Sequence, residues 1–97
     1  MTETTSVIGN KKVRKITMSE NLEISDDGYD GTILLLNPNG LARTILPVGV
    51  TFRMGYAVTI YNIGNGAEVT FDPNQLRYSI EIENHRTFIF DGTYWRS

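Results

Sequence analysis

The chain has 97 residues and a formal net charge of -2 at pH 7, with 40% hydrophobic and 21% charged residues. A chain of this size buries only about 60 to 70% of the surface that its unfolded form exposes, so it has room for one domain with one modest core. The small negative charge argues against free nucleic acid or an anionic membrane as the partner. Cysteine is absent, which excludes disulfides and thiolate metal sites, so packing, backbone pairing or association must hold the fold.

The beginning of the chain is polar and then basic. Residues 1–10 are rich in Thr and Ser and show neither helical nor strand periodicity. We therefore expect a flexible arm over residues 1–12 and a single β domain over residues 13–97. Four of the nine basic residues then fall within five positions, at Lys11, Lys12, Arg14 and Lys15. This cluster fits either a solvated edge strand, where Lys discourages unwanted pairing, or a tether onto an acidic surface.

Short apolar segments separated by turn residues follow. Residues 13–18 and 22–24 are predicted as a first strand region, because apolar and polar residues alternate in it. Residues 32–36 are apolar at consecutive positions, which predicts a strand covered on both faces, either inside a sandwich or by a neighbouring subunit. The sequence of residues 37–40, Asn-Pro-Asn-Gly, predicts a tight turn, and residues 41–46 are its predicted hairpin partner.

The second half of the chain alternates more clearly. Residues 56–61, 69–71 and 76–83 are predicted as strands, the last as an antiparallel strand with one wet face. Residues 87–90 form a further predicted strand, and the Asp-Gly pair at 91–92 predicts a last tight turn. No segment of ten or more residues carries a helical stripe, so we expect little or no helix. Tyr56, Val58 and Ile60 are predicted to share one face of their strand, opposite Ala57, Thr59 and Tyr61. In the strand over residues 76–83, the predicted core-facing residues are Leu76, Tyr78, Ile80 and Ile82.

These strands define the expected fold class. About seven to eight short strands with regularly spaced turns predict an all-β protein, either an antiparallel β-sandwich or a jelly-roll-like barrel. The pattern does not choose among these topologies.

Few residues suggest chemistry. His85 is the only histidine and lies in a polar turn, without the orienting and accepting groups that acid–base catalysis needs. Asp26, Asp27 and Asp30 superficially suggest calcium, but their spacing does not match the twelve-residue loop, so a hydrogen-bonded turn is favoured. We therefore expect no catalytic residue, no cofactor and no metal, and a protein that is not an enzyme.

The aromatic and arginine residues leave two interpretations open. The aromatic side chains either stack on sugars or bases, or anchor the edge of the core and an interface. Every basic residue after the N-terminal cluster is Arg, which suits bidentate pairing across protein interfaces. The predicted partner contacts are Lys11, Lys12, Arg14, Lys15, Arg43, Arg53 and Arg77.

The segments RTILPVG, MGYAVTIYNIG and FIFDGTYWRS, in this order and spacing, resemble a small β domain of bacteriophage virion proteins. Such domains occur in head decoration proteins and in parts of tail fibres. The matching positions are Thr44 to Pro47, Gly55 to Gly64 and Phe88 to Trp95, and the resemblance covers residues 18–96. These are largely turn and core residues, which indicate a fold rather than a site.

This resemblance implies a structural protein of the virion, commonly a homotrimer, made in the host cytoplasm and placed on the capsid surface. Its partner would be the major capsid protein, and it would stabilise the capsid by bridging subunits. The alternative is a receptor- or glycan-binding module of a tail fibre. A single-stranded nucleic-acid binder would need its Arg and Tyr residues to converge on one groove, and a small enzyme would need a nucleophile–base pair.

Overall fold

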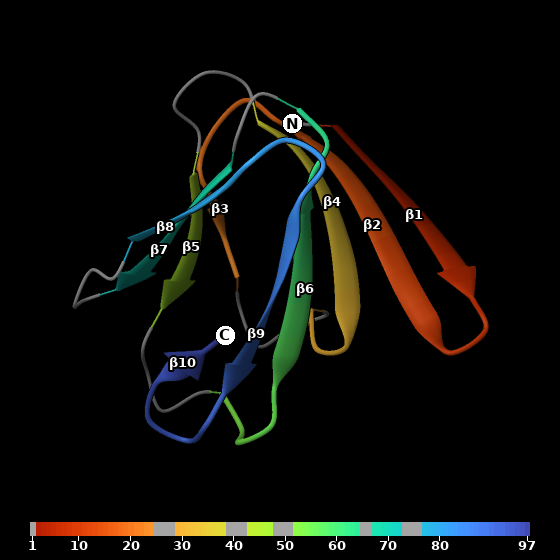
Figure 1. Ribbon diagram of the computed structural model, residues 1–97. Helices are drawn as coiled ribbons and strands as arrows, with labels where there is room; N and C mark the ends of the chain where they lie inside the picture. The colour runs from red at the N-terminus through yellow and green to blue at the C-terminus, as the bar shows by residue number, and fades with distance from the viewer. Residues whose placement is uncertain (1, 25–28, 39–42, 48–51, 65–66, 73–76) are drawn as a thin grey trace.

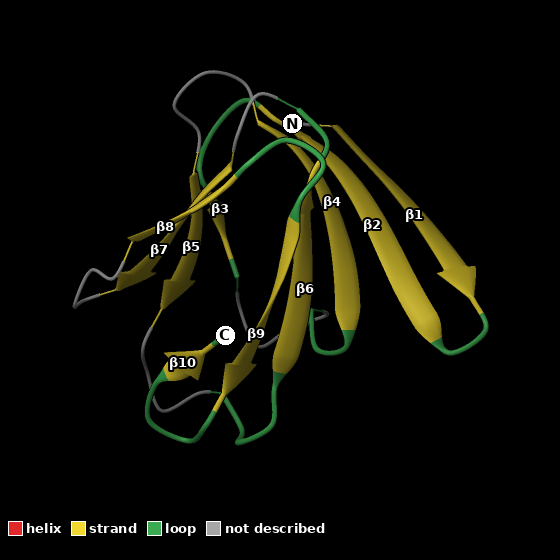
Figure 2. Ribbon diagram, in the orientation of Figure 1, coloured by secondary structure: helices red, strands yellow, loops and turns green. Residues whose placement is uncertain are grey.

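The computed structural model describes residues 2–24, 29–38, 43–47, 52–64, 67–72 and 77–97, and its regular structure there is entirely β-strand (Figure 2). The expectation of an all-β chain is therefore confirmed for these residues. The described part of the chain contains no helix with the length and apolar character needed to cross a bilayer. The strands are β1 (Thr2–Ile8), β2 (Lys11–Met18), β3 (Leu22–Glu23), β4 (Thr32–Pro38), β5 (Arg43–Pro47), β6 (Ala57–Asn62), β7 (Ala67–Asp72), β8 (Arg77–Ile80), β9 (His85–Phe90) and β10 (Trp95–Arg96).

The strands form two sheets (Figure 1). Six strands pair in the order β1-β2-β4-β6-β9-β10, and four in the order β3-β5-β7-β8. The pairs β2–β4, β4–β6, β3–β5 and β5–β7 are parallel, and the other four pairs are antiparallel. From β2 to β7 the chain therefore passes alternately between the sheets, and three successive passes stack side by side as in a solenoid.

This winding corrects two expectations. Pairing is not antiparallel throughout, and the hairpin predicted for residues 37–46 is wrong, because β4 continues through Pro38 while β5 belongs to the other sheet. Asn39 and Gly40 lie outside the described residues. Turn residues show where a strand ends but not whether the chain then returns along the same sheet or crosses to the opposite one.

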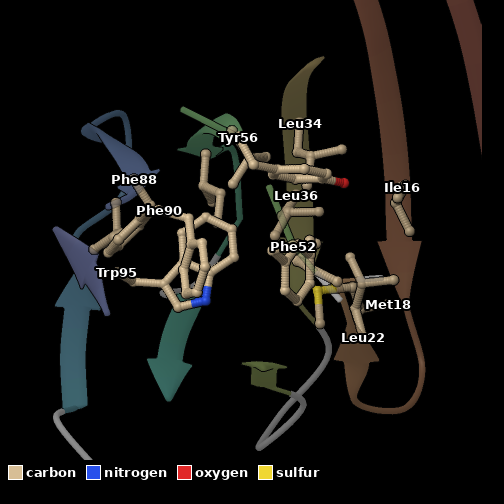
Figure 3. Packing of buried hydrophobic residues seen from close by; sticks show 14 residues of the cluster. Ile16, Met18, Leu22, Leu34, Leu36, Phe52, Tyr56, Phe88, Phe90 and Trp95 are labelled. Atoms are coloured by element: carbon tan, nitrogen blue, oxygen red, sulfur yellow. The ribbon is translucent and has the colours of Figure 1, made fainter. Parts of the chain in front are cut away.

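The core lies between the two sheets. Alternate residues of β2, β4, β6 and β9 are buried there, together with Leu22 of β3 and Ile80 of β8 (Figure 3). The predicted division of β6 into two faces is confirmed, since Val58 and Ile60 are buried while Ala57 and Thr59 are half-buried. Ile33 and Leu35, on the opposite face of β4, are only half-buried by the described residues, so the second face is not covered by a sandwich, and cover by a neighbouring subunit stays a prediction. The buried strand residues of the larger sheet include Ile16, Met18, Leu34, Leu36, Val58, Ile60, Phe88 and Phe90.

Aromatic rings fill one end of this core. The ring of Trp95 lies 5.1 Å from that of Phe52 and 5.3 Å from that of Phe90 (Figure 3). It also meets Tyr56 edge-on at 5.8 Å. Because edge-to-face pairs add to the burial of large apolar area, this cluster stabilises the core beyond what the buried area alone contributes.

A buried amide ends the strand that was predicted over residues 76–83. The Asn62 side chain donates from Nδ2 to the Ile80 carbonyl oxygen at 2.6 Å and accepts the Gly64 N–H at 2.8 Å. Strand β8 stops at Ile80, and Glu83 then adopts a φ of 67°. The prediction that Ile82 faces the core is wrong, since it is 58% exposed. Its alternation with polar neighbours could not reveal that Asn62 fixes a turn here.

We expect Trp95→Ala to lower the free energy of unfolding by about 3–5 kcal/mol, because it removes an aromatic ring from a closed cluster. Urea unfolding measures the change. Tyr94→Ala is the matched control: its side chain is 50% exposed, and its expected effect is about 1 kcal/mol or less. Equal losses for the two variants would contradict this account of the core.

We expect Gly64→Ala to cost about 1–3 kcal/mol, because overpacking forces neighbours to move. A Cβ at position 64 would lie 2.2 Å from Oδ1 and 3.2 Å from Cα of Asn37. The double variant Asn37→Ala/Gly64→Ala removes the closest atom, so a double-mutant cycle should show partial recovery. Additive losses would show that the side chain of Asn37 is not the obstacle.

Candidate partner-binding surface

The start of the chain forms a β-hairpin at the margin of the larger sheet, away from the smaller sheet (Figure 1). Strand β1 pairs with β2 over seven consecutive positions, from Thr2 opposite Thr17 to Ile8 opposite Lys11. This differs from the expectation of an arm without regular structure. The side chains of residues 3–7 are all exposed. Because neither face of β1 is covered, its sequence carries no apolar alternation by which a strand could be recognised.

The N-terminal basic residues divide between the two faces of β2. Alternation places Lys11 and Lys15 on the outer face of the sheet and Arg14 on the face shared with the buried Ile16. Lys12 shares that inner face but lies at the start of the strand, where it is exposed. The three lysines are therefore available to a partner, at the hairpin and close to its tip.

Arg14 is engaged within the chain. Its Nε lies 2.5 Å from Oε2 of Glu3 and its Nη2 lies 2.7 Å from Oε1, a bidentate pair. Its guanidinium carbon is also 4.3 Å from the ring centroid of Tyr29. The hydrogen bond from Arg14 holds the pKa of the Glu3 carboxyl below its ordinary value, and the pKa of Arg14 is raised in return. Arg14 thus fastens β1 and the Tyr29 segment to β2.

The other predicted contacts are spread over both sheets. Arg53, in the segment before β6, has a side chain that is 77% exposed and forms an ion pair with Asp30. Asp30 also accepts the backbone N–H of Ala57 at 3.0 Å. Arg43 and Arg77 begin β5 and β8 in the smaller sheet, and their side chains lie outside the described residues. The predicted set therefore does not converge on one surface.

Sequence reasoning missed an exposed patch next to Arg53. Met54 is 76% exposed and Tyr94 is 50% exposed, and the guanidinium carbon of Arg96 lies 5.9 Å from the centroid of the Tyr94 ring. A Cβ at Gly92 would lie 3.9 Å from Cβ of Met54, so the two loops that carry the patch adjoin. Met, Tyr and Arg are enriched in protein interfaces. The available signal was Tyr94 and Arg96, which lie close together in the sequence beside a turn, since Tyr and Arg are enriched in protein interfaces.

A carboxylate organises the loop beneath this patch. Asp91 Oδ1 accepts the backbone N–H groups of Thr93 at 2.8 Å and Tyr94 at 2.7 Å, while Oδ2 lies 2.7 Å from Nε of Arg96. The bond from Tyr94, followed by those from Arg96 and Thr93, lowers the pKa of Asp91 from 3.8 to about 2. The turn predicted here is confirmed, with Gly92 at a φ of 102°.

The aromatic residues do not gather into one open platform. Tyr56 and Trp95 are buried in the core. Tyr61 is half-buried on the outer face of the larger sheet, where its ring meets His85 edge-on at 4.6 Å. His85 also borders a hollow of about 320 Å³ whose other lining residues are Ile80, Glu81, Asn84 and Arg86.

The described residues contain no group of three or more His, Asp or Glu side chains placed to hold a metal ion. Of the three aspartates weighed for calcium, Asp30 is engaged with Arg53 and Ala57. Asp26 and Asp27 lie outside the described residues.

No protein-family model matches the chain, and no curated protein matches it.

The Asp91 loop predicts an acid dependence of stability. A carboxyl group with a lowered folded-state pKa contributes stability above its ordinary pKa, near 4, and loses it as pH falls towards about 2. We expect Asp91→Asn to show a smaller loss of stability than the parent protein over this pH range in urea titrations. Arg96→Gln keeps the backbone hydrogen bonds and should fall between the two. Identical pH slopes for all three proteins would contradict this assignment.

Proposed function

We propose that this chain is a bacteriophage capsid decoration protein that binds the major capsid protein from outside and stabilises the capsid. The observation that supports this most is the β1–β2 hairpin, which presents Lys11, Lys12 and Lys15 in exposed positions at the margin of the larger sheet. The resemblance of the core and turn segments to virion β domains points the same way.

The hairpin suits contact with an acidic surface. Glu3, the carboxylate of β1, is paired with Arg14, and the side chains of the three lysines are exposed to a partner. Charged residues at the periphery of a protein interface raise the association rate and fix the orientation of the partners more than they increase affinity. Contact with two capsid subunits at once would raise the work of separating them, because a ligand that binds only the assembled state stabilises that state.

The proposal includes a homotrimer and a β-sandwich or jelly-roll description of the fold. Two sheets that enclose one core are compatible with a sandwich. The half-buried outer residues Ile33, Leu35 and Tyr61 lie on a sheet face that has room for another copy.

The second candidate is a receptor- or glycan-binding module of a tail fibre. The exposed Tyr94 beside Arg96 favours it, because a ring with a free face can stack on a sugar. Burial of Tyr56 and Trp95 removes two of the aromatic residues that such a platform would use, so this candidate stands second.

The test is cosedimentation of the purified protein with capsids assembled in its absence. We expect the parent protein to pellet with capsids and the triple variant Lys11→Glu/Lys12→Glu/Lys15→Glu to lose at least ~10-fold in apparent affinity, because three contacts become repulsive. Binding should also weaken as salt rises.

Charge reversal is preferable to deletion of residues 1–15, since deletion would remove β1 and most of β2. Single variants give a matched comparison. Lys11→Glu should weaken capsid binding. Arg86→Glu should not, because Arg86 is exposed on β9, at the opposite end of the larger sheet. A folded parent protein that ignores capsids would overturn the proposal and place glycan binding first.

A further inference from the structure

The described sheets have four edge strands, and three of them are short. Strands β3 and β10 have two residues each and β8 has four. Strand β1 has seven residues. An edge strand presents unpaired backbone N–H and C=O groups, and short edges are one of the ways in which proteins avoid pairing with other chains. Only β1 lacks this protection among the described edges.

Strand β1 also lacks the other usual safeguards. Its sequence, TETTSVI, contains neither Lys nor Pro, and its register with β2 runs without a bulge. Five of its seven residues are β-branched, which favours the extended conformation. Its single charge, on Glu3, is already engaged by Arg14. The strand is therefore held in place by β2 while its other edge stays open.

We propose that two copies of this chain pair antiparallel through their β1 edges, about a two-fold axis at Thr5. This register opposes Thr5 to Thr5, Thr4 to Ser6 and Glu3 to Val7 of the second copy, and it uses all seven residues. In this register odd-numbered residues of one copy lie opposite odd-numbered residues of the other, and even-numbered residues lie opposite even-numbered ones. The inner faces of the two larger sheets therefore join into one continuous face. A register shifted by one residue would bring residues of opposite faces together.

The side chains of β1 favour a second copy as the occupant, because the charge of each copy is accommodated. Within one chain, Val7 lies between Lys12 on β2 and the open edge. In the paired form Glu3 of the second copy, held by Arg14 of its own chain, would lie beyond Val7 on the same face as Lys12. Val7, which is 69% exposed in the single chain, would gain a neighbour. No like charges would be directly opposed, which would otherwise be destabilising.

The contact differs from both contacts of the proposed function. It uses the backbone edge of β1, whereas capsid binding was assigned to lysine side chains on β2 and the homotrimer was placed on the outer face of the larger sheet. A single strand pair is a small interface compared with the ~1,200–2,000 Å² of stable complexes, so we expect an equilibrium that depends on concentration.

The absence of cysteine makes single-cysteine variants specific probes. Opposed residues of antiparallel strands have Cβ atoms about 4.5–5.5 Å apart, close to what a disulfide needs. Under copper-phenanthroline oxidation, Thr5→Cys should form a disulfide-linked dimer at least ~10-fold faster than Thr4→Cys or Ser6→Cys. A mixture of Thr4→Cys and Ser6→Cys should cross-link into heterodimers faster than either variant alone.

Sedimentation equilibrium supplies a second measurement that needs no oxidation. Thr5→Lys and Thr5→Glu should each lower the average mass of the protein, and an equimolar mixture of the two should restore the parent's mass, because position 5 meets itself. Thr17→Lys, an exposed position on the neighbouring strand β2, is the control and should associate as the parent does. A parent protein whose mass does not change with concentration, or one whose association is insensitive to position 5, would overturn the proposal.

Discussion

Burial of alternate side chains between two sheets is the constraint on which the rest of this structure depends. From β2 to β7 successive strands of each sheet lie parallel and side by side, and the opposite sheet covers their inner faces. The aromatic cluster around Trp95 closes one end of the core.

Polar groups set the limits of the winding. The buried amide of Asn62 ends β8 and turns the chain into β9, while Asp91 shapes the last turn before β10. At the other end the Glu3–Arg14 pair holds β1 against β2. Buried or paired groups of this kind specify one arrangement, since leaving one partner unsatisfied is costly.

The proposed functions are assigned to exposed surfaces outside the core. The hairpin combines an open backbone edge on β1 with exposed lysines on β2, and the patch around Met54 and Tyr94 adds a second exposed area at the loops. The proposed roles divide accordingly: side-chain charge for a foreign acidic surface, and the backbone edge for a second copy. Neither role asks for a catalytic group.

The sequence alone determined the all-β class, the division of β6 into two faces and the Asp91–Gly92 turn, because period-two alternation and turn residues are local properties. Strand partners were decided only by the tertiary structure: alternation reports which face is buried, not which strand lies beside it, so the parallel winding was missed. Strand β1 escaped recognition because neither face is covered. Likewise, the sequence predicted Arg14 as a contact to a partner, and only the tertiary structure showed that it pairs with Glu3 and lies over the ring of Tyr29.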